Sequence, residues 1–438
     1  MTPGLQNSRN SCALHGALAT LGAVPGVASV IHATAGCGAQ GYWGVNRLAG
    51  QAGSGHAGGL FASSSSVIEK HIVFGGTSRL REEIKNAVKT ISADLYLVVT
   101  GCAVEVVGDD VAAMVKEAQE QSFPVAHLQT PGFNGDTHRG YEIAMRGLEE
   151  AVNRLPRAER EPSAGLVNVL GIVPGQHPYA EGDLETLRQL GTLAGMEVNT
   201  LLTHVDSVAS WGKFPQAEVN WVFSPWGMSL ARDWQKKYGI PYVDFGSLPV
   251  GAAATADFLR MVAGRSEEAR AAVEKSAAEA TRREDFYLEK LIDAYVDFDL
   301  QKSFSFVGES LYAAGIVHFL ADTFGLVPET VVLTDIPIPE IQAHIRAREE
   351  PWLARFGAEL IFEEDARLIA GHLGARPPEL ILGSYLERAV AERLGVPLHE
   401  ISFPLPGEMV LAKSYAGFGG GVRLIEDLSR TLLQEAQV

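Results

Sequence analysis

The sequence is poor in cysteine, with only three in 438 residues. The three are Cys12, Cys37 and Cys102, and all lie in the first quarter of the chain. An odd count cannot pair completely within one chain, and residues 1–10 carry no apolar secretion signal. A disulfide framework is therefore not expected.

Positive charge is also scarce, because 36 Lys and Arg stand against 53 Asp and Glu, a formal net charge of −17. Nucleic acids and anionic membrane surfaces attract basic proteins, so neither is expected as a partner. No apolar run reaches the roughly 18 residues that suggest a membrane span. We expect a cytoplasmic protein with no membrane contact.

What the chain does contain is an alternation of short apolar runs and amphipathic helical segments, which predicts an α/β fold. We expect strands at 27–32, 95–99, 123–128, 166–170, 303–308 and 331–333, and helices at 13–21, 77–90, 111–120, 183–194 and 309–324. The run 95–99 is too apolar to alternate, as expected of a parallel strand covered on both faces.

The domain organisation is predicted from these elements and from one charged stretch. We expect a cluster-binding α/β domain over residues 1–160, a second α/β domain over 161–265, a connecting helix over 266–300 and a third α/β domain over 301–438. The Gly/Ala/Ser-rich stretch 50–66 is expected to be a flexible loop.

The cysteines stand at segment ends, which favours a binding role over that of buried, inert thiols. Cys37 lies between Gly36 and Gly38 in a loop after the strand at 27–32, and Cys102 follows Gly101 in a loop after the strand at 95–99. Glycine lets a backbone approach a ligand closely and frees amide groups for an anion. Ligands of open α/β sheets also bind beyond the carboxyl ends of strands.

Two kinds of metal site remain open. Iron–sulfur clusters typically take four thiolates, so a chain with three must borrow a ligand across a subunit interface. Zinc held by the three thiolates with His15 or His32 is the alternative, although the sequence has no Cys-x-x-Cys hook. We interpret His56, His71 and His138 as surface or loop histidines. No Ser/His/Asp grouping indicates catalytic residues.

Five motifs in the first third of the chain resemble, in content and order, the nitrogenase component 1 family, and more narrowly its β-type (K) subunits. They are Cys12-Ala13-Leu14-His15-Gly16-Ala17, the run from His32 to Cys37, Val73-Phe74-Gly75-Gly76, the run from Cys102 to Asp110, and Thr130-Pro131-Gly132-Phe133. Weaker matches extend to Tyr415-Ala416-Gly417-Phe418-Gly419-Gly420, so the resemblance covers nearly the whole chain. It implies an oxidoreductase subunit with three Rossmann-like, doubly wound domains and parallel sheets.

The resemblance also implies a cofactor and partners. Cys12, Cys37 and Cys102 would hold an iron–sulfur cluster, P-cluster-like with 8Fe or a 4Fe-4S cluster, shared with an α-type subunit in an α2β2 heterotetramer. An ATP-dependent iron–sulfur reductase homodimer would supply electrons. These would pass through the cluster to an active-site metallocluster in the α-type partner.

Other residues take their expected roles from the same resemblance. The amides of Gly36, Gly38 and Gly101 would stabilise the cluster, and Phe74 with Gly75 would lie where the reductase docks.

One position departs from the family pattern. Nitrogenase β-subunits carry a serine in the Thr-Pro-Ser-Phe motif whose oxygen can ligate the oxidised P-cluster, and this chain has Gly132 there. The nearby Thr130 and Thr137 are poorly placed to substitute, because Thr130 precedes a proline and Thr137 follows a turn.

The departure favours a nitrogenase-like reductase of another substrate, and we expect a methylthio-alkane reductase, a group that releases methanethiol by cleaving C–S bonds. The alternatives are the β subunit of a dinitrogen-reducing nitrogenase and a non-catalytic scaffold for nitrogenase cofactor assembly. A subunit of dark-operative protochlorophyllide reductase agrees less well with the motifs.

Overall fold

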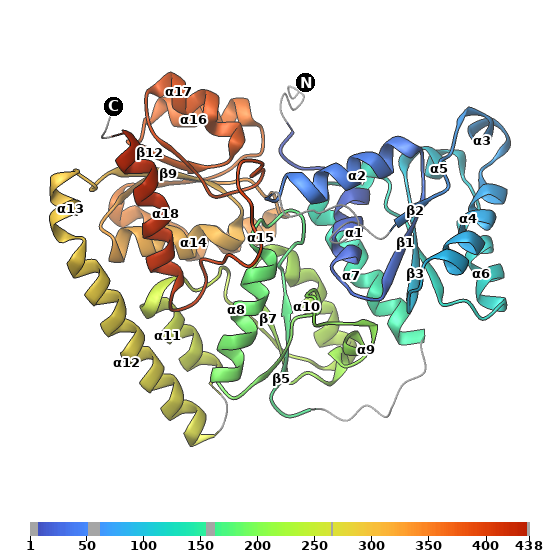
Figure 1. Cartoon of the computed structure of the whole chain (residues 1–438), viewed down its shortest axis with the longest axis horizontal. Coiled ribbons are helices and arrows are strands. Elements are labelled where there is room, and N and C mark those ends of the chain that lie inside the picture. The colour runs from blue at the N-terminus through green and yellow to red at the C-terminus, as the bar shows by residue number, and fades with distance from the viewer. Residues whose placement is uncertain (1–7, 51–61, 155–162, 264–265, 436–438) are drawn as a thin grey trace.

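Three parallel β-sheets form the frame of the computed structural model, which describes residues 8–50, 62–154, 163–263 and 266–435 (Figure 1). Two sheets have four strands and one has five, and every strand pair is parallel. The predicted α/β class with parallel sheets is confirmed. His56 and most of the predicted loop at 50–66 lie outside the described residues.

The first sheet has the strand order β2-β1-β3-β4. Alternate residues of its strands face opposite sides, so α1 and α7 cover one face and α4 and α6 the other. The elements of this unit, blue to cyan in Figure 1, are α1 (Ala13–Gly22), β1 (Val27–His32), α2 (Ala35–Arg47), β2 (Ala62–Ser64), α3 (Glu69–Phe74), α4 (Thr77–Thr90), β3 (Leu95–Thr100), α5 (Cys102–Val107), α6 (Val111–Glu120), β4 (Val125–Leu128), the 3-10 turn η1 (Gly132–Asn134) and α7 (Thr137–Arg154).

The second sheet repeats this topology with the order β6-β5-β7-β8. Its elements are β5 (Leu166–Leu170), α8 (Ala180–Leu193), β6 (Glu197–Asn199), α9 (Val208–Trp211), the 3-10 turn η2 (Phe214–Gln216), β7 (Val219–Val222), α10 (Pro225–Tyr238), β8 (Tyr242–Asp244) and α11 (Gly251–Val262). The stretch expected as a connecting helix forms α12 (Glu267–Lys290) and α13 (Ile292–Asp297). The mostly exposed α12 buries Val273 and Ala277 and runs along the outside of the molecule (Figure 1).

The third sheet has the order β11-β10-β9-β12-β13, which is the arrangement of a doubly wound sheet. Its elements are β9 (Ser303–Gly308), α14 (Ser310–His318), the π-helical turn η3 (Phe319–Thr323), β10 (Val327–Leu333), α15 (Pro339–Leu353), the 3-10 turn η4 (Ala354–Phe356), β11 (Glu359–Phe362), α16 (Ala366–Ala375), β12 (Leu380–Gly383), the 3-10 turn η5 (Tyr385–Glu387), α17 (Arg388–Leu394), β13 (Leu398–Glu400) and α18 (Gly420–Glu435). The helix expected at 309–324 is therefore two segments, α14 and η3.

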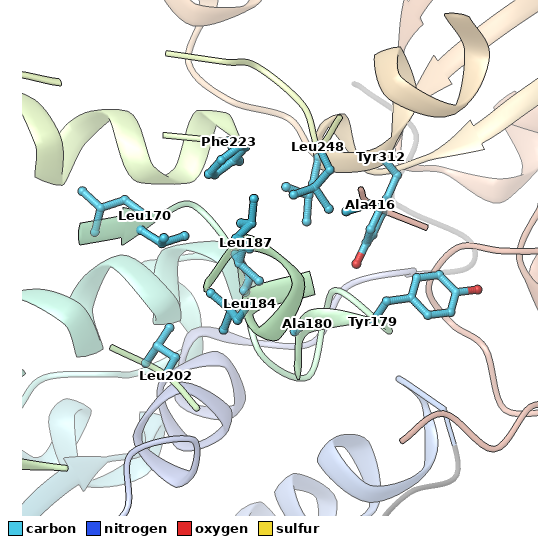
Figure 2. Packing of buried hydrophobic residues seen from close by; sticks show 14 of the residues in the cluster. Leu170, Tyr179, Ala180, Leu184, Leu187, Leu202, Phe223, Leu248, Tyr312 and Ala416 are labelled. Atoms are coloured by element: carbon cyan, nitrogen blue, oxygen red, sulfur yellow. The ribbon is translucent and has the colours of Figure 1, made fainter. Parts of the chain in front are cut away.

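One hydrophobic core runs between the three sheets. Its buried residues come from α1 and β3 of the first unit, α8 and β7 of the second, and β9 and α18 of the third. Figure 2 shows part of it, where Leu184 and Leu187 of α8 lie with Phe223 and Leu248 near Tyr312 of α14. Because all three units bury residues in this one core, their sheets pack against one another as one body.

Polar side chains meet inside that core at a junction of all three units. His138 of α7 is fully buried, its Nδ1 lies 3.1 Å from Asp136 Oδ2, and its Nε2 lies 2.8 Å from Glu309 Oε2. Its ring stacks on Trp226 of α10 at a centroid separation of 4.3 Å. The interpretation of His138 as a surface or loop histidine was wrong, because Trp226 of the second unit and Glu309 of the third enclose its ring.

The two carboxylates decide the charge of this histidine. Burial opposes an imidazolium, yet Glu309 and Asp136 raise the pKa of His138 well above its ordinary value. Burial likewise opposes the Glu309 carboxylate, but the facing His138 and His177 hold the pKa of Glu309 well below its usual range. The junction therefore contains a buried, charged and hydrogen-bonded pair.

Replacing His138 with Gln tests this pair. The variant leaves Glu309 buried without its cation, which typically costs 3–5 kcal/mol of the free energy of unfolding. Because the folded pKa of His138 is raised, its stabilisation is fully present below the unfolded value of about 6.5 and is lost as the pH rises through the folded value. Thermal or denaturant unfolding should show a larger difference from the wild type near pH 6 than near pH 10. An exposed histidine, His204, supplies the control His204→Gln, and an equal deficit at both pH values would contradict the assignment.

Candidate metal centre

All three cysteines lie at the beginning of a helix, which corrects the expectation that Cys37 and Cys102 sit in loops. Cys12 is the N-cap of α1, Cys37 lies in the first turn of α2, and Cys102 is the first residue of α5. The first amide groups of a helix lack intrahelical acceptors, and the helix dipole places partial positive charge there. Each cysteine side chain therefore stands where a helix start can stabilise a bound anionic group.

Strand pairing brings two of these turns together. Strands β1 and β3 are neighbours in the first sheet, and their last residues His32 and Thr100 are register partners. Cys37 and Cys102 each follow one of these strands, at the point where the strand order changes direction. This edge is where open α/β sheets bind ligands.

The third turn is brought in by close packing of two helices. A Cβ built on Gly16 of α1 would lie 2.0 Å from the Thr137 carbonyl oxygen, and one on Gly140 of α7 would lie 2.1 Å from the Ala13 carbonyl oxygen. Only glycine permits this approach at either crossing point. The crossing sets Cys12 beside η1, which immediately precedes α7.

Gly132 of η1 marks the place where two thiols converge. A Cβ built there would lie 3.2 Å from Cys102 Sγ and 3.5 Å from Cys12 Sγ. The Gly132 amide donates to Cys102 Sγ at 3.1 Å. The sequence pattern indicated only a lost oxygen ligand at Gly132 and gave no sign of this donor.

The other predicted glycines differ in what they offer. A Cβ on Gly101 would lie 2.6 Å from Ala33 Cβ and 3.8 Å from Cys37 Sγ, so its lack of a side chain lets the two turns meet. Its amide donates to the His32 carbonyl at 2.9 Å and is thus engaged within the chain. Gly36 is exposed and Gly38 half-buried in the first turn of α2, beside Cys37.

The surroundings of Cys12 favour the thiolate. Burial opposes the charge, but hydrogen bonding to His15 and to nearby backbone amides holds the pKa of the Cys12 thiol below its ordinary value. Cys102 is exposed and Cys37 half-buried, so the site opens to the surface.

The arrangement of the three cysteines fits a metal cluster for which this chain supplies only part of the ligands. Within the described residues, no three His, Cys, Asp or Glu side chains are close enough to hold a single metal ion. His32 does not face the thiols, because its ring nitrogens lie 2.9 Å from Ser65 Oγ and 3.0 Å from Asp109 Oδ2. A multi-iron cluster spans a wider set of thiolates than one zinc ion does and needs further ligands from another chain.

The hydroxyls nearest to Gly132 are already bonded. Thr130 Oγ1 donates to the Thr100 carbonyl at 2.9 Å and is fully buried. Thr137 Oγ1 accepts from the Ser11 amide at 3.1 Å. Thr130 Oγ1 also accepts from the Thr100 amide at 3.1 Å, and Thr137 is buried at the start of α7, so both hydroxyls are engaged within the chain.

Beside the cysteines lies an exposed apolar surface, here named the α3–α5 patch, made of Ile68, Ile72, Val73, Phe74, Val106 and Val107. Phe74 is 86% exposed, which excludes a place in the core of this chain. It ends α3, and Gly75 follows with a positive φ of 87° that favours glycine.

Asp109 anchors the turn that presents Phe74. Its carboxylate accepts the Gly76 amide at 2.8 Å and lies 3.0 Å from His32 Nε2. A Cβ on Gly76 would lie 2.5 Å from Asp109 Oδ2, so glycine is required for this contact. The sequence signal for Asp109 was its place in the motif after Cys102, but nothing there indicated its partner.

Known proteins resemble this chain over most of its length. A model described as nitrogenase component 1 type oxidoreductase matches residues 12–433. The nitrogenase molybdenum-iron protein beta chain of Frankia alni is 26% identical over 410 residues, which cover 85% of this chain and 74% of that protein. A light-independent protochlorophyllide reductase subunit from Bradyrhizobium sp. (strain ORS 278) is 26% identical over 332 residues, covering 74% of this chain and 61% of that protein.

A solved structure supports the fold. The structure titled "Nitrogenase Cp1 at pH 6.5" superposes with a TM-score of 0.76 at 18% sequence identity, covering 99% of this chain and 95% of that one. In the described part of the present chain, no helix has the length and apolar character to cross a membrane.

The anchoring of the Phe74 turn can be tested with Asp109→Ala. Hydrogen bonds to a charged group are typically worth about 1.5–3 kcal/mol each, so their loss should free the turn. We expect faster amide exchange at residues 71–77 and unchanged protection in β1 and β3. The neighbouring Asp110 caps α6 by accepting from the Ala113 amide, so Asp110→Ala should instead loosen the start of α6. Equal exchange at 71–77 in both variants would refute the anchoring role.

Proposed function

The chain belongs to the nitrogenase component 1 type oxidoreductase family, and we propose that it acts as the β-type subunit of a nitrogenase-like reductase. In this role it holds an iron–sulfur cluster at the interface with an α-type partner. The observation that carries the proposal is the convergence of Cys12, Cys37 and Cys102 from three helix N-termini at one edge of the first sheet.

The chain's own residues have distinct tasks toward the cluster. The three thiolates bind iron, and the amide of Gly132 donates to the sulfur of Cys102, which lowers electron density on that ligand. The N-termini of α1 and α2 favour the negative charge of a thiolate-bound cluster. Such a cluster, when bound, supplies one-electron transfer.

The partner follows from the incomplete ligand set. Three thiolates leave a cluster short of protein ligands, and the exposed Cys102 with the open first turn of α2 provides a face on which a second subunit can close the site. By analogy with the family, the assembly is an α2β2 heterotetramer. The α-type partner carries the active-site metallocluster.

Sharing of the cluster predicts that the chain produced alone retains little iron. The full complement should appear only when the α-type partner is co-produced, because the partner supplies the remaining thiolates and excludes water. Iron and sulfide are quantified on both preparations. In the complex, Cys37→Ala should lose cluster and assembly together, since metal binding contributes folding free energy. A full cluster on the lone chain would disprove sharing.

The α3–α5 patch is proposed as part of the surface on which the ATP-dependent iron–sulfur reductase docks. A contiguous exposed apolar surface marks an interaction site, and a large aromatic such as Phe74 can dominate the binding energy. The patch adjoins the helix that begins with Cys102, so a reductase docked there approaches the thiols closely.

Phe74→Ala should weaken docking by a few kcal/mol and slow reduction of the substrate, because hot-spot aromatics typically contribute about 2 kcal/mol or more. The cluster spectrum should stay unchanged. The matched control is Phe286→Ala on α12, since Phe286 is 51% exposed but lies outside the patch. Reductase affinity and turnover are measured for both variants, and an unaffected Phe74 variant would remove the patch from the docking surface.

For the substrate, we propose reductive C–S cleavage of methylthio-alkanes. Support comes from Gly132, which removes the serine oxygen that dinitrogen-reducing β subunits offer to an oxidised P-cluster, while the neighbouring threonines are engaged elsewhere. The β subunit of a dinitrogen-reducing nitrogenase and an assembly scaffold remain the alternatives. Retention of all three cysteines disfavours the scaffold.

Turnover of the assembled complex decides among these roles. With its reductase, ATP and a low-potential electron donor, the complex should release methanethiol from a small methylthio-alkane and form little ammonia from dinitrogen. Both products are measured in parallel on one preparation. Ammonia as the main product would establish nitrogen reduction instead, and a cluster-loaded complex without either activity would favour the scaffold.

A further inference from the structure

His15 lies between two of the cysteine-bearing turns. Its Nε2 is 3.2 Å from the carbonyl oxygen of Cys37, and its Nδ1 is bonded to Ser11 Oγ. The side chain is half-buried, and its Cδ2 would lie 3.3 Å from a Cβ built on Gly41 of α2. His15 thus spans from the first turn of α1 to the first turn of α2.

The partners fix which nitrogen carries the proton. A backbone carbonyl can only accept, so Nε2–H donates to the Cys37 oxygen. The Ser11 hydroxyl then donates to the unprotonated Nδ1. The ring also interacts with the Cys12 thiol: burial opposes a charge on the ring, but hydrogen bonding to Cys12 and to the Cys37 backbone raises the pKa of His15 above its ordinary value.

The contact between His15 and Cys37 matters because different parts of the structure position the three thiols. Pairing of β1 with β3 fixes the turns that carry Cys37 and Cys102. Cys12 belongs to α1, outside the sheet, and its turn is tied to η1 and α7 through the bridge with Asp136. His15 is a direct side-chain link between the Cys12 turn and the Cys37 turn.

We propose that His15 is a positioning residue that sets the separation of Cys12 from Cys37 and so preorganises the cluster ligands. This inference rests on the proposed function of the chain. Residues that orient metal ligands through hydrogen bonds typically change metal affinity by about 10–100-fold when they are replaced. His15 acts through its hydrogen bonds to the Cys37 backbone and to the Cys12 thiol, and does not itself bind iron.

The test uses the complex with the α-type partner and three variants. His15→Leu fills the space without a donor, and His15→Gln retains an N–H that can reach the Cys37 carbonyl. His127→Gln is the control, because His127 lines a groove between β4 and α7 that no cysteine lines. Iron release to a chelator, the midpoint potential of the cluster and the unfolding temperature are measured for each.

His15→Leu should release iron about tenfold faster than the wild type, with a shifted midpoint potential. His15→Gln should fall within about twofold of the wild type, and His127→Gln should not differ from it. Iron retention equal to the wild type in His15→Leu would overturn the proposal, as would equal loss in the Leu and Gln variants. A purely structural role would lower the unfolding temperature without this difference between Leu and Gln.

A second variant covers the case in which His15→Leu does not fold. Ser11→Ala removes the hydroxyl that orients the ring and leaves only a small change in volume, so iron release should still be several-fold faster. Unchanged release in Ser11→Ala would then overturn the proposal. If the wild-type complex carries no cluster, the proposed function itself is wrong. If the wild type and the His15→Leu variant both carry a full cluster, only the role of His15 is wrong.

Discussion

Parallel pairing between β1 and β3 is the constraint on which the cysteine site depends. Because neighbouring parallel strands end at the same edge, the residues that follow His32 and Thr100 must leave the sheet side by side. Gly101 then allows the two departing turns to approach until Cys37 Sγ would lie 3.8 Å from a Cβ built on that glycine. The pairing of the two strands therefore places both thiols near each other without a long connecting loop.

The remaining geometry is added by helix packing. Gly16 and Gly140 let α1 and α7 cross with backbone against backbone, which brings Cys12 to Gly132 and to the sulfur of Cys102. A side chain at either crossing would separate the helices and move Cys12 away from the other thiols. The glycine of the Cys12-Ala13-Leu14-His15-Gly16-Ala17 motif is thereby explained by packing and not by contact with a ligand.

The helices and strands could be predicted from the sequence where apolar runs and helical periodicity were strong. The helices at 77–90 and 111–120 and the strands at 27–32, 166–170 and 303–308 occur at the predicted residues. The loops expected at Cys37 and Cys102 are helix starts: Cys37 lies in the first turn of α2, and Cys102 follows the N-cap Gly101 of α5. The buried state of His138 could not be predicted, since its partner Glu309 is remote in sequence and local periodicity carries no information on such pairs.

Of the candidate site, the sequence supplied the three thiols and the exposed phenylalanine but not the contacts that organise them. The Gly132 amide, the Asp109 anchor and the His15 bridge all depend on tertiary approach between separate elements. Resemblance to a family could point to these positions as motif members. It could not say which atom each one touches.

Asp136 connects the cysteine site to the junction between the sheets. Its backbone pairs with that of Cys12, and its carboxylate bonds to His138, which in turn bonds to Glu309 of the third unit. Displacing the third sheet from the first would therefore separate buried charges, at a cost of several kcal/mol. The cysteine site is built on a part of the molecule that resists such movement, which is consistent with the proposed electron relay. The exposed turn at Phe74 is tied to the same frame through Asp109, which accepts the Gly76 amide and faces His32 at the end of β1.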